Sequence, residues 1–221
     1  MVKTMKTLVV PDVHGRKFWI EPCLNWQGSI VFLGDYHDPY SEEVSKDNSL
    51  KNLKKLVEFY ESNKDRITCL LGNHDANYII ERGFADRLDY YNYPKVVDLM
   101  KRLNLQLCYQ INNIFFSHSG VLPEWLELYN LKLDELNNIP LNHSALRSIS
   151  VNRGGVGPGG ILWGDVREYI LADKHIPNLY QIFGHTQLQD KPIIMDDFAD
   201  LDCRQCFIVD CETKEIKLYG S

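Results

Sequence analysis

The sequence Ile67-Thr68-Cys69-Leu70-Leu71-Gly72-Asn73-His74-Asp75 changes character after its fifth residue. Residues 67–71 are mostly apolar and predict a buried strand, so the polar residues that follow would lie at a strand's carboxyl end. Open α/β sheets bind their ligands at that end. Gly72 allows close backbone approach, while Asn73 and His74 offer an amide oxygen and an imidazole, which can both bind a metal. This stretch therefore predicts an α/β fold with a ligand site at the strand end.

Four other apolar segments end in the same way, at residues 6–10, 29–33, 114–116 and 180–183. The potential metal ligands that follow them are Asp12 and His14, Asp35, His118, and His185. Of the seven histidines in the chain, four follow strand-like segments directly, counting His74. A chance scatter of histidines would not produce this arrangement, so we interpret these strand ends as parts of a site.

The motifs that carry this pattern are Asp12-x-His14, Gly34-Asp35-x-x-Asp38, Gly72-Asn73-His74-Asp75, His118 and Gly184-His185-Thr186. Together they resemble the calcineurin-like metallophosphoesterases, and their spacing is most similar to the phosphoprotein phosphatase branch of that superfamily. Each motif alone is weak, but all five occur in order over most of the chain. The resemblance implies a four-layer α/β/β/α sandwich of two mixed sheets, with the site at one end.

Length and composition fit this expectation. With 221 residues, 44% of them hydrophobic, we expect a single domain over residues 1–221. The net charge of -6 argues against a general nucleic-acid binder. Neither a cleavable signal nor an apolar run of membrane-spanning length is visible, so we expect a cytoplasmic protein without membrane contact. The oligomeric state is left open.

Periodicity predicts helices over residues 41–63 and 94–103, each with one apolar face. Asn112-Asn113 predicts a two-residue turn between strands at 105–111 and 114–116. Residues 207–210 and 215–219 predict a closing antiparallel pair. Parallel crossovers followed by hairpins indicate two mixed sheets.

All six cysteines are expected to be reduced, because three lie in strand-like runs and no secretion signal is visible. Cys203, Cys206 and Cys211 lack a fourth ligand for a structural zinc site. Ordinary strand and loop positions are the favoured interpretation of this cluster, and a redox role is the alternative.

The resemblance implies two metal ions that share Asp35. The first would be held by Asp12, His14 and Asp35, and the second by Asp35, Asn73, His118 and His185. These nitrogen and oxygen ligands suit manganese, iron or zinc better than calcium, and the identity of the metals stays open. Many wider relatives have a further histidine ligand where this chain has Gln187, so the first ion should have fewer protein ligands.

The resemblance also assigns the general acid, His74, which would protonate the leaving oxygen while Asp38 orients it. The phosphatase branch usually has a phosphate-binding arginine after the residue that matches Asp38, but this chain has Pro39 there. Another arginine must bind the substrate phosphate, and the candidates in order of preference are Arg167, Arg153 and Arg16. The remaining histidines, His37, His143 and His175, are expected at the surface.

We expect a dinuclear metal-dependent phosphatase that hydrolyses phosphomonoesters, above all phosphoproteins of the serine/threonine or tyrosine type, by attack of a metal-bridging hydroxide. The alternative is a hydrolase of nucleotides or dinucleoside polyphosphates, in which an aromatic patch of Phe84, Tyr90, Tyr91 and Tyr93 would stack a base. A non-catalytic scaffold of the same fold is a further alternative, against which the intact ligand set argues.

Overall fold

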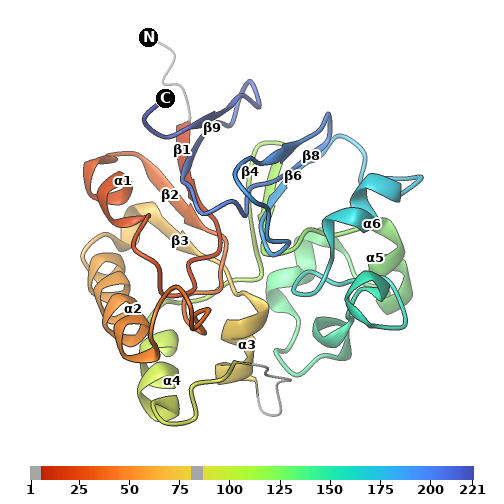
Figure 1. Cartoon of the computed structure of the whole chain (residues 1–221). Coiled ribbons are helices and arrows are strands. Elements are labelled where there is room, and N and C mark those ends of the chain that lie inside the picture. Colours follow the sequence, from red (N-terminus) through yellow and green to blue (C-terminus); the bar gives the residue numbers. More distant parts are fainter. Residues whose placement is uncertain (1–5, 81–86) are drawn as a thin grey trace.

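A computed structural model of the chain describes residues 6–80 and 87–221 (Figure 1). Its strands are β1 (Lys6–Val10), β2 (Ser29–Phe32), β3 (Ile67–Cys69), β4 (Cys108–Ile111), β5 (Ile114–Ser117), β6 (Tyr180–Phe183), β7 (Ile193–Ile194), β8 (Phe198–Asp200), β9 (Phe207–Asp210) and β10 (Ile216–Leu218). Its α-helices are α1 (Ile20–Asn25), α2 (Lys46–Glu61), α3 (Asn73–Ile79), α4 (Tyr93–Lys101), α5 (Pro123–Tyr129) and α6 (Val166–Leu171). Four short 3-10 helices cover Lys64–Arg66, Leu133–Asn138, Ser144–Arg147 and Val151–Arg153. Among the described residues, no helix combines the length and apolar character needed to cross a membrane.

The strands form two mixed sheets of five strands each, in the orders β10-β9-β1-β2-β3 and β4-β5-β6-β8-β7. In the first sheet β1, β2 and β3 are parallel to one another, β9 is antiparallel to β1, and β10 is antiparallel to β9. In the second sheet β5, β6 and β8 are parallel and the outer strands are antiparallel. The expected mixed sheets and both expected hairpins are therefore confirmed.

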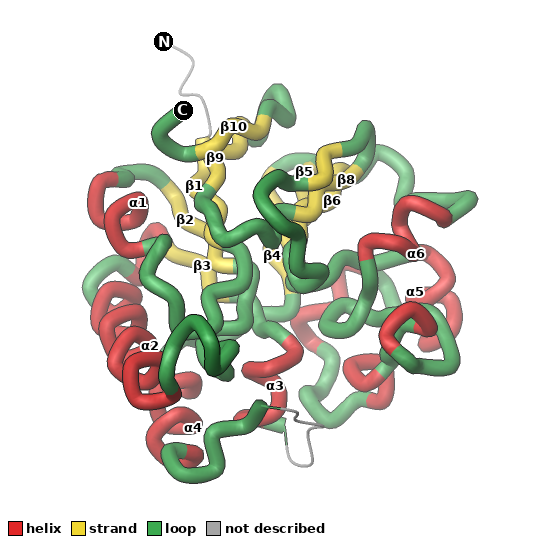
Figure 2. The backbone as a smooth tube through the Cα atoms, in the orientation of Figure 1, coloured by secondary structure: helices red, strands yellow, loops and turns green. Residues whose placement is uncertain are grey.

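The two sheets pack face to face, and helices cover their outer faces (Figure 2). Alternate residues of β1 show this division, because Leu8 and Val10 pack toward α1, α2 and α4, whereas Val9 packs toward the second sheet. In the second sheet, Phe116 points inward and Phe115 packs against the helical side that contains α5. The result is the expected four-layer α/β/β/α sandwich.

Some expected boundaries were wrong. The helix predicted over residues 41–63 begins only at Lys46, because the Ser45 side chain accepts the backbone N–H of Asn48 and caps the helix there. The strand predicted from residue 105 begins at Cys108, since Gln106 forms only an isolated bridge with Leu70. The helix predicted over residues 94–103 is present as α4.

Candidate metal centre

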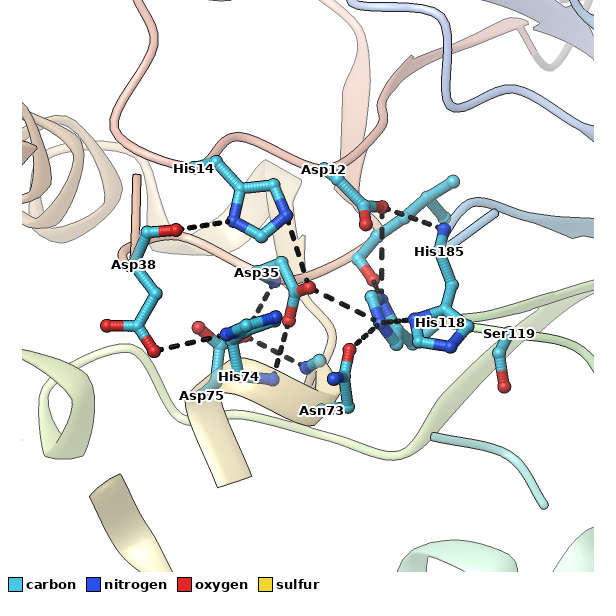
Figure 3. A network of polar contacts seen from close by, with 12 residues as sticks. Asp12, His14, Asp35, Asp38, Asn73, His74, Asp75, His118, Ser119 and His185 are labelled. Atoms are coloured by element: carbon cyan, nitrogen blue, oxygen red, sulfur yellow. Dashed lines mark hydrogen bonds and ion pairs between the residues drawn. The ribbon is translucent and has the colours of Figure 1, made fainter. Parts of the chain in front are cut away.

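The polar residues that follow five strands converge on one end of the sandwich (Figure 3). Asp12 and His14 follow β1, Asp35 follows β2, Asn73 begins α3 after β3, His118 follows β5, and His185 follows β6. All six side chains are buried, with at most 8% of any residue exposed. Both sheets thus contribute to one cluster, as the strand-end pattern indicated.

One group of donor atoms surrounds Nε2 of His118. This nitrogen lies 3.0 Å from Oδ1 of Asn73 and 3.0 Å from Nδ1 of His185. The other ring nitrogen of His118 lies 2.9 Å from the carbonyl oxygen of Leu33 and donates its proton there, which leaves a lone pair on Nε2. Two imidazole nitrogens and an amide oxygen therefore meet in a buried position, where a cation would satisfy all three.

Asp35 lies between the two halves of the cluster. Its Oδ2 is 3.4 Å from Nε2 of His14 and 3.7 Å from Nε2 of His118. Its Oδ1 accepts the backbone N–H of His74 at 2.9 Å, which fixes the carboxylate in this position. A carboxylate between two imidazole groups is well placed to bridge two cations.

The atoms of the cluster fall into two groups, in each of which they lie within 4.8 Å of one another. One group contains Asp12, Asp35, His118 and His185, and the other contains His14, Asp35 and His74. Asp12, which the resemblance assigns to the first ion, lies in the group that contains His118 and His185, and its Oδ1 accepts the backbone N–H of His185 at 3.1 Å. Asp35 belongs to both groups, as the bridging assignment requires.

The electrostatics of the cluster favour a cation. Burial lowers the pKa of His14 to about 3 and also lowers the pKa of His118 and of His185, so these rings are neutral and can donate lone pairs. Burial, together with the charges of Asp202 and Asp35, raises the pKa of Asp12 well above its usual value. A bound metal would offset the repulsion between carboxylates crowded in this way, so the residues present fit a pair of divalent ions.

The loops that carry these ligands hold them in unusual backbone conformations. His14, Asp35, Asp38 and His185 have φ values of 45°, 54°, 56° and 70°, in a region that residues other than glycine seldom adopt. Gly72 is required for a different reason, because a Cβ there would lie 2.1 Å from Oδ1 of Asp35. The cluster therefore depends on locally strained backbone, which is common at functional sites.

Asp75 connects two of these loops through their backbone N–H groups. Its carboxylate accepts the backbone N–H groups of Asp35 at 2.7 Å, Tyr36 at 2.9 Å and Gly72 at 2.9 Å. It is fully buried and contacts backbone rather than the proposed metal positions. The sequence contained Asp75 within a motif, but its role in aligning the loops became visible only in the structure.

His74 and Asp38 are paired, as expected. Nδ1 of His74 lies 3.1 Å from Oδ2 of Asp38, whose other oxygen accepts the hydroxyl of Tyr78. Burial opposes a charge on His74, but the carboxylates of Asp35 and Asp38 outweigh burial and raise the pKa of His74. This pairing favours the protonated imidazole that can act as an acid.

The three arginines proposed for phosphate binding lie at different distances from the cluster. Arg153 Nη2 donates to the carbonyl oxygen of His185 at 3.1 Å, so Arg153 borders the metal ligands. The side chain of Arg167 is 58% exposed and is paired with Asp165. Arg16 donates to the backbone oxygen of Asp12 at 3.4 Å while pairing with Glu43 at 2.6 Å.

A fourth arginine, which the sequence analysis missed, lies beside His74. Nη2 of Arg87 is 3.0 Å from Nε2 of His74, and its guanidinium carbon lies 3.7 Å from the centre of the Tyr40 ring. Arg87 belongs to none of the motifs, and we find no sequence signal that would have singled it out.

The predictions for residues outside the motifs were confirmed in part. The surface position expected for His37 was wrong, because it is 1% exposed and bonded to Ser49 at 2.7 Å. In the proposed aromatic patch, Tyr90 and Tyr91 are exposed, whereas Tyr93 stacks on Tyr78. Phe84 lies outside the described residues. All six cysteines are free, as predicted, and all are buried, at Cys23, Cys69, Cys108, Cys203, Cys206 and Cys211.

Solved structures share this fold at low sequence identity. A cold-active protein-tyrosine phosphatase from a psychrophilic Shewanella species is 15% identical, with a TM-score of 0.62 over 97% of this chain and 80% of that one. A protein serine/threonine phosphatase from Saccharomyces cerevisiae, described as similar to human phosphatase PP5, is 14% identical, with a TM-score of 0.58 over all of this chain and 81% of that one.

Sequence relatives are consistent with this likeness. The symmetrical bis(5'-nucleosyl)-tetraphosphatase of Buchnera aphidicola subsp. Acyrthosiphon pisum (strain 5A) is 31% identical over 134 residues, which are 55% of this chain and 46% of that protein. The match to this curated relative thus spans about half of its length. The family model described as calcineurin-like phosphoesterase matches residues 5–200, nearly the whole chain. The chain belongs to the calcineurin-like phosphoesterase family.

Proposed function

We propose that this chain is a dinuclear metal-dependent phosphatase that acts on phosphomonoesters, with phosphoproteins as the preferred substrate class. The observation that carries this proposal is the position of Asp35, whose Oδ2 lies 3.4 Å from Nε2 of His14 and 3.7 Å from Nε2 of His118. A shared carboxylate between two sets of neutral donors suits a pair of manganese, iron or zinc ions.

In this proposal, as the resemblance implies, Asp12, His14 and Asp35 would hold the first ion, and Asp35, Asn73, His118 and His185 would hold the second. Asp12 also lies close enough to His118 and His185 to border the second ion. When bound, such a pair supplies a water nucleophile of lowered pKa and positive charge for the phosphoryl oxygens. Asp75 keeps the loops that carry these ligands in register through the backbone N–H groups of Asp35, Tyr36 and Gly72. The protein's own contribution is therefore a rigid set of neutral imidazoles around one shared carboxylate.

His74 gives a proton to the leaving oxygen from its Nε2. Asp38 holds the opposite ring nitrogen at 3.1 Å, so the ring has a fixed orientation and a raised pKa. Proton transfer from a positioned acid matters most for leaving groups that are poor without it, such as a serine alkoxide. Arg153, Arg16 and Arg167 remain candidates for contacts to the substrate phosphate, and Arg153 and Arg16 each donate to the backbone of a proposed metal ligand.

A second candidate function is hydrolysis of dinucleoside polyphosphates. Two observations favour it, namely the symmetrical tetraphosphatase relative at 31% identity and the exposed rings of Tyr90 and Tyr91, which are 76% and 88% exposed. An exposed aromatic ring can stack on a nucleobase. The chemistry at the metals would be the same, so only the substrate separates the two functions.

The test is a substrate panel with protein stripped by chelator and then supplied with Mn²⁺, Fe²⁺, Zn²⁺ or Ni²⁺. Phosphoserine, phosphothreonine and phosphotyrosine peptides should be hydrolysed with a higher kcat/KM than diadenosine tetraphosphate or mononucleotides. A preference for diadenosine tetraphosphate would establish the second candidate instead. Absence of turnover with every metal and substrate would overturn both and favour a non-catalytic scaffold.

A further inference from the structure

Arg87 lies beside the acid pair of His74 and Asp38. Pro39 follows Asp38 in the sequence, so that position supplies no guanidinium. Arg87 approaches the same acid pair from another part of the chain, with Nη2 3.0 Å from Nε2 of His74. We propose that Arg87 binds the phosphoryl oxygens of the substrate beside His74, an inference that rests on the phosphatase function proposed above.

The geometry places the Arg87 guanidinium at the reacting bond. Because Asp38 occupies Nδ1 of His74, only Nε2 can face a leaving oxygen, and this is the nitrogen that Arg87 contacts. The ring of His14 lies against His74 with a centroid distance of 5.1 Å, so Arg87 is also close to the metal ligands. A group in this place borders both the leaving oxygen and the phosphoryl oxygens attached to the same phosphorus.

The hydrogen-bonding capacity of Arg87 is only partly used. Within the described part of the chain, its Nη1 is buried and has no hydrogen-bond partner. The same part of the chain provides no carboxylate within ion-pair distance of Arg87, whereas Arg16 is paired with Glu43, and both Arg153 and Arg167 are paired with Asp165. A guanidinium with a free donor and an uncompensated charge is suited to two oxygens of a phosphate.

The segment that carries Arg87 is fixed to the rest of the site. The carbonyl oxygen of Leu88 accepts from Nζ of Lys46 at 2.9 Å. The backbone N–H of Asp89 donates to the hydroxyl of Tyr78 at 2.8 Å, and this hydroxyl in turn donates to Asp38. The buried carboxylate of Asp89 also contacts Nε2 of His37 at 3.4 Å. One buried network therefore positions both the partner of His74 and the backbone beside Arg87.

Tyr40 fixes the guanidinium itself. The Arg87 guanidinium carbon lies 3.7 Å from the centre of the Tyr40 ring, and the same ring packs edge-on against His14 at 5.3 Å. Stacking on an aromatic face holds the plane of the guanidinium without using its N–H groups. Arg87 is thus oriented before the substrate arrives, and its Nη1 stays available.

The experiment compares Arg87→Ala, Arg87→Lys and the control Arg102→Ala, in which an exposed arginine paired with Glu61 is removed from the end of α4. Each metal-loaded variant is assayed with p-nitrophenyl phosphate and with a phosphoserine peptide, and its inhibition by inorganic phosphate is measured. Arg87→Ala should lower kcat/KM about 10- to 100-fold on both substrates and weaken phosphate inhibition, because a charged hydrogen-bond donor is lost. Metal content should not change, and Arg87→Lys should recover part of the loss since it keeps the charge without the planar fork.

The outcomes separate the possible explanations. A loss confined to the phosphoserine peptide, with phosphate inhibition intact, would overturn the proposal and show that Arg87 acts only through His74. Unchanged kinetics and phosphate inhibition in an active enzyme would overturn it as well, while leaving the proposed function standing. A wild-type protein that hydrolyses no phosphoester would remove the proposed function, and this inference with it. Equal losses on both substrates, with Arg102→Ala like the wild type, would establish Arg87 as a substrate-binding residue.

Discussion

Nδ1 of His74 lies 3.1 Å from Oδ2 of Asp38, and the carboxylate of Asp38 is completely buried. Its other oxygen accepts the hydroxyl of Tyr78, so both oxygens are used and the carboxylate has one orientation. Because Nδ1 is bonded to Asp38, Nε2 of His74, which Arg87 contacts at 3.0 Å, is the ring nitrogen that a substrate would meet. The pairing with Asp38 therefore sets His74 apart from the imidazoles proposed as metal ligands, although all of them are close together.

The first prediction concerns the acid. His74→Asn should retain both metals and lose about 10²- to 10⁴-fold in turnover of a phosphoserine peptide, the usual contribution of a positioned proton donor. At about 1.4 kcal/mol per tenfold change, this corresponds to about 3–5 kcal/mol of barrier. The loss on p-nitrophenyl phosphate should be much smaller, because p-nitrophenolate leaves without a proton. Steady-state kinetics and elemental analysis check both parts, and loss of metal would show that His74 is a ligand.

The second prediction concerns pH. The carboxylates of Asp35 and Asp38 raise the pKa of His74 against the effect of burial, so the acid form persists to a higher pH. Asp38→Asn removes one of these charges and lowers the pKa, so the acid form is lost at a lower pH. The alkaline decline of kcat on the phosphoserine peptide should therefore move to lower pH in Asp38→Asn. A decline that stays in place or moves upward would contradict the pairing.

The third prediction compares two arginines on the same carboxylate. Arg153 and Arg167 both pair with Asp165, but only Arg153 also donates to the backbone of a proposed metal ligand, His185. Arg153→Ala should raise KM for p-nitrophenyl phosphate several-fold more than Arg167→Ala does, because Arg153 contacts the backbone of His185 whereas the Arg167 side chain is 58% exposed. A larger effect of Arg167→Ala on KM would restore it as the leading candidate of the two.

The fourth prediction concerns the hydrogen bonds that Asp75 accepts from the ligand loops. An asparagine at position 75 can accept two of the three backbone N–H groups, but the third would face its side-chain NH₂ group. Asp75→Asn should therefore lower the free energy of unfolding by about 1–3 kcal/mol. It should also weaken metal binding, since the loops at Asp35 and Gly72 lose their common anchor. Urea unfolding of the chelator-stripped protein measures the first effect and metal titration the second. The exposed Asp98→Asn serves as control, and equal stability of the two variants would exclude the anchoring role.

The parts of the fold that the sequence predicted are those governed by local pattern. Apolar runs such as residues 6–10 and 29–33 became β1 and β2, and the candidate ligands after them converged because these neighbouring strands are parallel and end at one edge. The turn at Asn112 was also predictable, because its φ of 54° is one that asparagine tolerates. For motifs that lie just past a strand, spacing along the chain was enough to predict that their side chains meet in one site.

Arg87 and His37 show why the remainder could not be predicted. Arg87 reaches His74 only because the neighbouring residues Leu88 and Asp89 are held by partners 42 and 52 positions away in the sequence, Lys46 and His37. His37 is buried by the same long-range contacts, although we expected it at the surface because it is not a matched position of the motifs. Contacts of this kind depend on the whole fold, so no local sequence pattern predicts them.

The most direct measurement of the central claim is a metal titration of chelator-stripped protein, followed by elemental analysis and phosphate release. Asp35 belongs to both donor groups, so the wild type should bind about two metal ions per chain, with activity rising as the second is bound. Asp35→Asn should lose both ions and activity together, because a shared anionic ligand compensates both cations. The exposed Asp98→Asn should behave like the wild type. Two metals bound to Asp35→Asn with wild-type affinity, or a wild type fully active with one metal, would contradict the account.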